Sequence, residues 1–266
     1  MERLLTLHLT SEGCAAEALL NGIPVASTSR AGGECLLPVH EFTLTGANRL
    51  DLTAACVTPG QESLPQPCTA VKPTWARLRL LLVRQGRSPM DDNARQLAEI
   101  SWAAPRDKSF EAPVTLTSEV ELPINFPRWK WLDAPPISFN PGTRRLVVEF
   151  LQQMALDLSL GRPDGLIAAA KLRFDELALA YQMTPAQAVQ RFRDHLQARF
   201  EAKALNVLPP AADEVVLRPI LDGHMIEALS PAGTPVLRTQ NTPPPHGECT
   251  WPMRLAVVEG RIYVLR

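Results

Sequence analysis

Two histidine positions are the clearest candidates for acid–base chemistry in this sequence. Asp194 directly precedes His195, and a carboxylate beside an imidazole could orient it as a general base. Neighbouring residues of a helix point about 100° apart, so in the helix expected here the two side chains do not face each other. We therefore interpret Asp194 and His195 as part of an exposed polar helix face.

The second histidine ends the turn Asp222-Gly223-His224. Turn chemistry alone explains the aspartate and the glycine. If the flanking strands form one sheet, His224 would stand at the mouth of a sheet cavity beside Arg218 and Glu227. The residues predicted to line such a ligand pocket are Arg218, His224, Glu227, Trp251 and Tyr263.

Two tryptophans alternate with two basic residues in Arg128-Trp129-Lys130-Trp131. In an extended segment the tryptophans point to one side, and Arg128 and Lys130 point to the other. Tryptophan and arginine are enriched at the centres of protein interfaces, so these four residues are candidates for contact with a partner protein. The alternative interpretation is that they pack between two parts of the chain.

Carboxylates and cysteines indicate no further site. Asp157, Asp175 and Glu176 fall on expected helix surfaces, without a spacing that would fix two carboxylates for glycosidase chemistry. The five cysteines are irregularly spaced, and His246 and Cys249 form an HxxC with no second pair nearby. We therefore expect reduced thiols, no metal site and no cofactor. Because GxSxG, P-loop, GxGxxG, HExxH and EF-hand patterns are missing from the sequence, a non-enzymatic protein is favoured over an enzyme, which stays open as an alternative.

Composition and charge narrow the class of partner. Hydrophobic residues make up 45% of the 266 residues and charged residues 21%, which is typical of a globular protein. The net charge of −1 leaves no basic excess for nucleic-acid phosphates. Apolar runs fall short of the roughly 18 residues of a membrane span, and the first residues do not resemble a secretion signal. We therefore expect a cytoplasmic protein that binds neither nucleic acid nor membranes.

The first 122 residues are expected to form short β-strands. Residues 4–10, 49–53 and 114–122 alternate apolar and polar side chains. Asn21-Gly22 predicts a tight hairpin, because both residues tolerate positive φ. Seven or eight such strands, separated by turn signals, predict an antiparallel β-sandwich domain over residues 1–122.

A proline-rich joint is predicted over residues 123–142, where five prolines surround the two tryptophans. From residue 143 the apolar residues recur at helical spacing, and after residue 209 they alternate again. These patterns predict three helices packed on an antiparallel β-meander over residues 143–266. The second helix is expected over about residues 164–181, and the third is expected to start with Thr184 as its N-cap and Pro185 at its first position. The expected fold class is therefore α+β with two domains.

Two resemblances accompany these patterns. Leu20-Asn21-Gly22-Ile23-Pro24-Val25, followed by Pro38-Val39-His40-Glu41-Phe42 and Gly46-Ala47-Asn48-Arg49-Leu50-Asp51-Leu52, resembles the sugar-binding-type jelly-roll sandwiches attached to glycoside hydrolases. That resemblance implies a sandwich and carbohydrate binding. The element order of residues 143–266 resembles the cone-shaped fold of the nuclear-transport-factor-like superfamily, which contains both enzymes and binding modules.

Three hypotheses about function follow. The first is a non-enzymatic protein-interaction module (an adaptor, inhibitor or assembly factor) that binds a partner protein through a sandwich edge or the seam between the halves. The second is a small-molecule-binding or enzymatic pocket within residues 143–266. The third is carbohydrate binding by the N-terminal sandwich, which requires a groove with exposed aromatic side chains.

Overall fold

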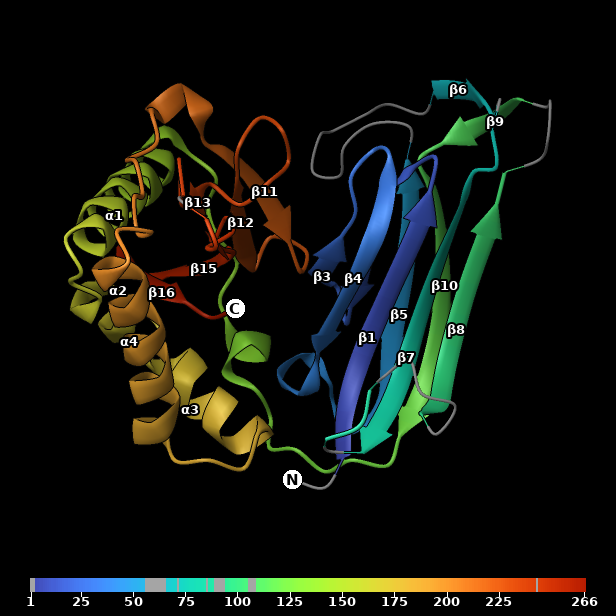
Figure 1. Ribbon diagram of the computed structural model, residues 1–266, viewed down its shortest axis with the longest axis horizontal. Coiled ribbons are helices and arrows are strands. Elements are labelled where there is room, and N and C mark those ends of the chain that lie inside the picture. Colours follow the sequence, from blue (N-terminus) through green and yellow to red (C-terminus); the bar gives the residue numbers. More distant parts are fainter. Residues whose placement is uncertain are drawn as a thin grey trace. The chain divides into compact units, whose positions relative to one another are not determined.

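The chain has an α+β fold with antiparallel sheets, as predicted. A computed structural model (Figure 1) describes residues 3–55, 66–70, 72–84, 86–88, 94–104, 109–242 and 244–266. The chain divides into two compact units, residues 1–127 and residues 128–266. Most of the proline-rich segment expected to act as a joint therefore belongs to the second unit.

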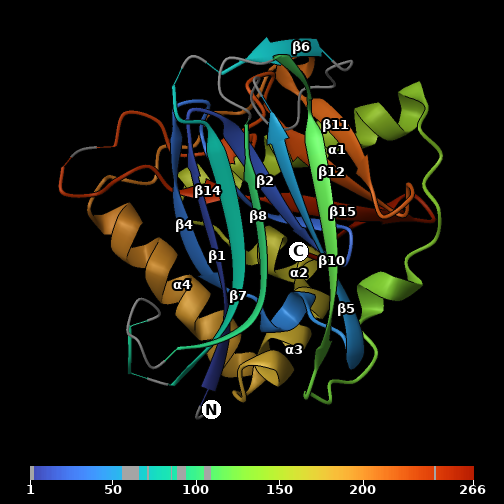
Figure 2. The same ribbon diagram turned by 90° about the vertical axis from the view of Figure 1, so that its right-hand side faces the viewer.

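The first unit is a sandwich of two four-stranded antiparallel sheets (Figure 2). The first sheet has the strand order β4 (Gly32–Pro38), β1 (Arg3–Glu12), β7 (Trp75–Arg84), β8 (Arg95–Ala103). The second has the order β10 (Val114–Leu122), β5 (Gly46–Ala55), β2 (Ala15–Leu20), β3 (Ile23–Ser27). A small ladder pairs β6 (Gln66–Thr69) with β9 (Ser109–Ala112), and a 3-10 turn, η1, spans His40–Phe42.

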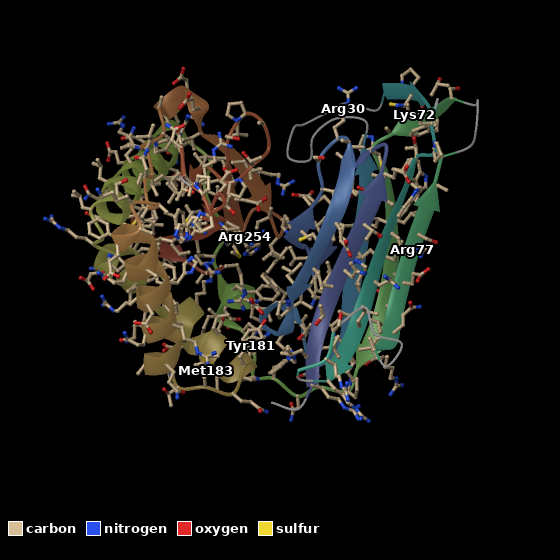
Figure 3. All side chains as sticks on the ribbon, in the orientation of Figure 1. Arg30, Lys72, Arg77, Tyr181, Met183 and Arg254 are labelled. Carbon is tan, nitrogen blue, oxygen red and sulfur yellow. The ribbon has the colours of Figure 1, made fainter. Side chains whose placement is uncertain are left out.

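Period-two alternation builds the core of this sandwich. On β7, Ala76 and Leu78 are fully buried, whereas Arg77 between them is exposed (Figure 3). Leu78 pairs with Leu9 of β1, which is fully buried as well. Consecutive strand residues point to opposite faces, so one face of each sheet supplies the apolar interior.

Two asparagines fix the hairpin between β2 and β3. Asn21 has a φ of 53°, and its Nδ2 donates to Phe42 O at 2.8 Å and to Asn48 Oδ1 at 2.9 Å. Asn48 is buried, and its own Nδ2 donates to the carbonyls of Leu44 and Gly46. The residues that carry the jelly-roll resemblance therefore hold turns together, which is a structural role.

The second unit packs helices on a four-stranded meander. Its helices are α1 (Pro141–Ser159), α2 (Asp164–Ala169), α3 (Lys171–Ala180) and α4 (Pro185–Glu201). Its sheet has the order β11 (Val216–Ile220), β12 (Met225–Leu229), β15 (Met253–Val258), β16 (Arg261–Val264). A short ladder joins β13 (Leu237–Arg238) to β14 (Thr250–Trp251), and 3-10 turns lie at η2 (Lys130–Asp133) and η3 (Ala212–Glu214).

The helices differ from the prediction at one point. The single helix expected over residues 164–181 is two helices, because Ala170 leaves helical geometry with φ −96° and ψ 13°. Neither glycine nor proline marks this break in the sequence. The start of α4 is confirmed, with Thr184 as the N-cap in a capping box with Gln187 and Pro185 at the first position. Among the described helices, none is long and apolar enough to cross a membrane.

The core of the second unit lies between the helices and the sheet. From α1 it receives Val147, Leu151 and Leu158, which repeat at helical spacing. From the sheet it receives Ile226 and Leu255, which are partners on β12 and β15. One face of the sheet therefore carries the core against the helices.

Candidate functional site

The candidate site is a pocket in the second unit, between helices α2–α4 and strands β14–β16. Its volume is about 240 Å³. The wall is largely apolar, with Phe174 from α3, Phe192 from α4, and Trp251 and Met253 from the strands. Arg173 and Thr250 are the charged and the hydroxyl-bearing members of the lining.

Small side chains leave this space open. The rings of Phe174 and Phe192 meet at a centroid distance of 5.5 Å and form part of the wall. Ala170 and Ala188 also line the pocket, and a larger apolar residue at either position would extend into it. A dry cavity of about 150 Å³ is enough to hold benzene. The pocket therefore has room for an aromatic ring with a substituent.

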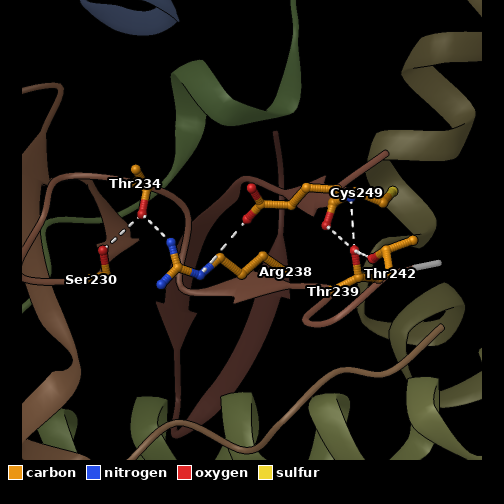
Figure 4. Close-up of polar contacts among 7 residues, drawn as sticks. Ser230, Thr234, Arg238, Thr239, Thr242 and Cys249 are labelled. Carbon is orange, nitrogen blue, oxygen red and sulfur yellow. Dashed lines mark hydrogen bonds and ion pairs between the residues drawn. The ribbon is translucent and has the colours of Figure 1, made fainter. Parts of the chain in front are cut away.

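Hydrogen bonds join the residue that follows β13 to the residue that precedes β14 (Figure 4). Two hydrogen bonds join Thr239 and Cys249. The backbone N–H of Thr239 donates to Cys249 O at 2.8 Å, and the backbone N–H of Cys249 donates to Thr239 Oγ1 at 2.8 Å. Thr242 adds a bond from its hydroxyl to Thr239 Oγ1 at 3.0 Å. Arg238, the last residue of β13, donates from Nη1 to Thr234 Oγ1 at 2.9 Å. The chain entering Thr250 and Trp251 is thereby fixed.

Of the five residues predicted to line a ligand pocket, the structure places Trp251 in the wall. Arg218 and Glu227 instead bond to each other, with Arg218 Nε donating to Glu227 Oε2 at 3.0 Å. Glu227 is buried and also pairs with Arg254 at 3.2 Å. Arg254 follows Met253 on β15, and Met253 lines the pocket. Because neighbouring strand residues point to opposite faces, Arg254 and the two residues that it is linked to, Glu227 and Arg218, belong to the face of the sheet away from the pocket.

The remaining two predicted pocket residues also lie elsewhere. His224 Nδ1 is 2.5 Å from Ala134 O, so the turn contacts the segment that precedes α1. Tyr263 precedes Val264 on β16, and Val264 lines the pocket. Because neighbouring strand residues face opposite ways, Tyr263 belongs to the other face of the sheet.

The two predicted interface tryptophans are buried, and each is 1% exposed. Lys130–Asp133 forms the 3-10 turn η2 and not an extended segment, yet Trp129 and Trp131 still share one environment. Both rings lie beside the guanidinium of Arg266, at 5.8 Å and 5.7 Å from the ring centroids. These distances fit cation–π contacts.

A buried carboxylate completes this cluster. Glu176 accepts hydrogen bonds from the backbone N–H of Lys130 and from Arg266 Nη1, the latter at 2.5 Å. Only 5% of Glu176 is exposed, so its expected position on the helix surface is wrong. The side chains of Arg128 and Lys130 lie on the exposed side, where Arg128 Nε donates to Asp133 at 2.8 Å. The sequence offered no sign of the role of Arg266, which lies 90 residues from Glu176.

Among the described cysteines, Cys68 departs from the prediction of reduced thiols. Cys68 is disulfide-bonded, whereas Cys14, Cys35 and Cys249 are free. Cys56 lies outside the described residues. Burial raises the pKa of the Cys14 thiol to about 11. Within the described part of the chain, no group of three or more His, Cys, Asp or Glu side chains could hold a metal ion.

Comparison of the chain with protein-family models, with curated proteins and with solved structures finds no match.

Proposed function

We propose that the second unit binds a small, largely apolar molecule in the pocket between α2–α4 and β14–β16. The observation that supports this proposal is the ring-lined wall formed by Phe174, Phe192 and Trp251 around about 240 Å³. Ligand pockets combine such walls with a few polar groups that fix orientation. This proposal develops the second of the three hypotheses.

The chemistry of the wall defines the class of ligand. An aromatic ring would stack on or against the three aromatic side chains. Arg173 and Thr250 supply a guanidinium and a hydroxyl group to the same lining. Both can donate hydrogen bonds to oxygen. We therefore infer a ligand with an aromatic or short acyl body and one oxygen-bearing end, such as a carboxylate or carbonyl group.

The protein-interaction hypothesis has less support from the described strands. A peptide that extends a sheet needs an accessible edge with free backbone donors, and charges and prolines discourage such pairing. The four edge strands of the sandwich, β3, β4, β8 and β10, each carry residues of this kind. These residues are Pro24, Glu34, Pro38, Arg95, Glu99, Glu119 and Glu121.

Carbohydrate binding by the sandwich is also weakly supported. Trp75 and Trp102 are both half-buried. Trp75 Nε1 donates to Glu12 at 2.9 Å, and Trp102 packs edge-on against Phe110 at 5.3 Å. A sugar platform needs an open aromatic face, and these contacts use the two rings for packing instead.

Calorimetric titration with naphthoate tests the proposal, because this probe carries an apolar bicycle and one carboxylate. We expect saturable binding at a single site. Replacement of Ala188 by Phe puts a ring into the space that the ligand would occupy. If the ligand must pay a packing cost of about 1–3 kcal/mol to enter, its affinity should fall by roughly 5-fold to 150-fold.

The matched control is Ala198→Phe, the same substitution at an exposed position of the same helix. It should leave naphthoate affinity unchanged. Equal affinities in the Ala188→Phe and Ala198→Phe variants, or no saturable binding by the unaltered chain, would contradict the proposal. Circular dichroism of both variants shows whether α4 and the sheet remain folded.

A further inference from the structure

A thiol and an imidazole meet beside the pocket. Cys249 Sγ lies 3.7 Å from His195 Nε2, although the two residues are 54 positions apart in the chain. That distance is within the range of a hydrogen bond to sulfur, and the thiol can donate when the imidazole carries its proton on Nδ1. One turn along α4, Arg199 Nη1 donates to Gly247 O at 3.1 Å. The loop that carries Cys249 is thereby tied to the helix that carries His195.

The same two elements build the wall of the pocket. Ala188 and Phe192 line the pocket from α4, and His195 and Arg199 follow at helical spacing on the same stripe. Thr250 and Trp251, which come directly after Cys249, line it from β14. Cys249 also packs against the hydrophobic core of this unit. Cys249 immediately precedes the lining residue Thr250, so a group that extends out of the pocket past Thr250 would lead toward the thiol.

The ionisation of the pair suits proton transfer. Burial lowers the pKa of His195, and the positive charge of Arg199 acts in the same direction. Burial raises the pKa of Cys249, which Arg199 partly offsets. At neutral pH the pair consequently rests as a thiol beside an uncharged imidazole. An uncharged imidazole can accept a proton as a thiol attacks, which is how an adjacent base activates a nucleophile.

We propose that Cys249 accepts an acyl group from an acyl thioester whose apolar acyl body lies in the pocket, with His195 as the proton acceptor. The substrate class rests on the proposed function, because the pocket selects the acyl body. Sγ of Cys249 forms a bond to the carbonyl carbon, and the carbon–sulfur bond of the substrate breaks. The thiol proton passes to His195 Nε2 and then to the departing sulfur, which leaves as a free thiol. Nothing is oxidised or reduced in this exchange.

Cys35 provides a reference thiol within the same chain. It is half-buried like Cys249, and burial raises its pKa as well. In the described part of the chain, however, Cys35 has no hydrogen bond to a histidine, whereas Cys249 has His195. The two thiols are similarly exposed, so a difference in their reactivity would come from the imidazole and the pocket beside Cys249.

The test uses the full chain and the naphthoyl thioester of N-acetylcysteamine as the probe. Peptide mass spectrometry over time gives the acylation rate at each cysteine. We expect acylation of Cys249 at least ~10-fold faster than that of Cys35. His195→Gln should slow the reaction at Cys249 by about 10²-fold, as for loss of a general base, and leave Cys35 unchanged. His246→Gln removes the other nearby histidine and should change neither rate.

Each outcome bears on one part of the proposal. Equal rates at Cys249 and Cys35, or an unchanged rate in His195→Gln, would overturn the reaction, while naphthoate binding would still support the pocket. Ala188→Phe should slow acylation by the naphthoyl thioester but not by the corresponding acetyl thioester. If it slows neither, the pocket does not select the acyl body, and the assigned substrate class is wrong.

Discussion

His40 shows how burial of one side chain makes stability depend on pH. Its Nε2 accepts a hydrogen bond from the backbone N–H of Leu5 at 2.8 Å, which requires an uncharged ring nitrogen. Its ring also packs edge-on against Phe126. Burial lowers the pKa of His40 from 6.5 to about 4 in the folded protein. Protonation is therefore favoured in the unfolded chain over the interval between these two values.

We expect the free energy of unfolding to fall as the pH decreases from about 6.5 to about 4, because the unfolded chain binds the extra proton. The contribution of His40 is complete above the unfolded pKa, and it decreases by at most about 1.4 kcal/mol per pH unit within the interval. Urea unfolding followed by circular dichroism at several pH values measures this slope. His40→Gln should show a shallower slope, and an identical slope in the variant would disprove the role of His40.

The chemistry of the candidate site could be predicted only in part from single residues. Trp251 was identified as a pocket residue, and Cys249 and His195 were each noticed in a local pattern. Their pairing depends on a loop that returns to α4 after 54 residues. Local spacing carries no information about such a contact. Arg218 and Glu227, both predicted to line the pocket, bond to each other instead, and the alternation of β15 puts this ion pair on the face of the sheet away from the pocket.

At the scale of elements, the cluster around η2 joins three separate parts of the second unit. The backbone of Lys130, the carboxylate of Glu176 on α3 and the guanidinium of Arg266 after β16 meet at one buried point. Trp129 and Trp131 cover the guanidinium. A buried charge that loses its partner is costly, whereas replacing both charges by apolar groups often costs little.

We therefore expect Glu176→Leu to lower the free energy of unfolding by about 3–5 kcal/mol, because the buried guanidinium of Arg266 would lose the carboxylate that pairs with it. The double variant Glu176→Leu/Arg266→Met should recover much of that loss. Chemical unfolding of the two variants and the unaltered chain gives the comparison. A double variant no more stable than Glu176→Leu would show that the ion pair is not the source of the effect.

The helical elements show where sequence patterns succeed and where they end. The start of α4 was predictable because its cap is local in sequence, as Thr184, Pro185 and Gln187 show. The break at Ala170 was not, since its neighbours continue a helical pattern. The apolar stripes of α3 and α4 were evident, but the pocket exists because Ala170 and Ala188 both lie on its wall. Whether the apolar faces of α3 and α4 pack solidly or leave a cavity depends on which residues of other elements lie against them.

At the scale of the whole molecule, the limits of the second unit matter. The prediction began its domain at residue 143, whereas the compact unit begins at Arg128. The intervening segment is bonded to the rest of that unit: Ile137 N–H donates to Gly223 O at 2.9 Å, and Lys130 N–H donates to Glu176. Periodicity cannot reveal such a segment, because its contacts are neither helical nor strand-like.

We predict that a fragment of residues 128–266 folds alone, with a circular dichroism spectrum that combines helix and strand, because its core cluster lies within it. A fragment of residues 143–266 should be clearly less stable, since it lacks Trp129, Trp131 and the backbone partner of Glu176. Thermal unfolding of the two fragments measures the difference. Equal melting temperatures would show that the segment contributes nothing to the fold of this unit.

The hairpin at Asn21 also bears on how the protein ages chemically. Asparagine followed by glycine deamidates readily, because the unhindered glycine nitrogen can attack the side-chain carbonyl carbon. Here Asn21 Oδ1 accepts from Arg49 N–H at 2.9 Å, and its Nδ2 is bound to Phe42 and Asn48. The side chain must leave all of these bonds before the attack can occur. These hydrogen bonds therefore protect the Asn21-Gly22 peptide. Deamidation at Asn21 would accumulate in proportion to the fraction of time that the turn is open.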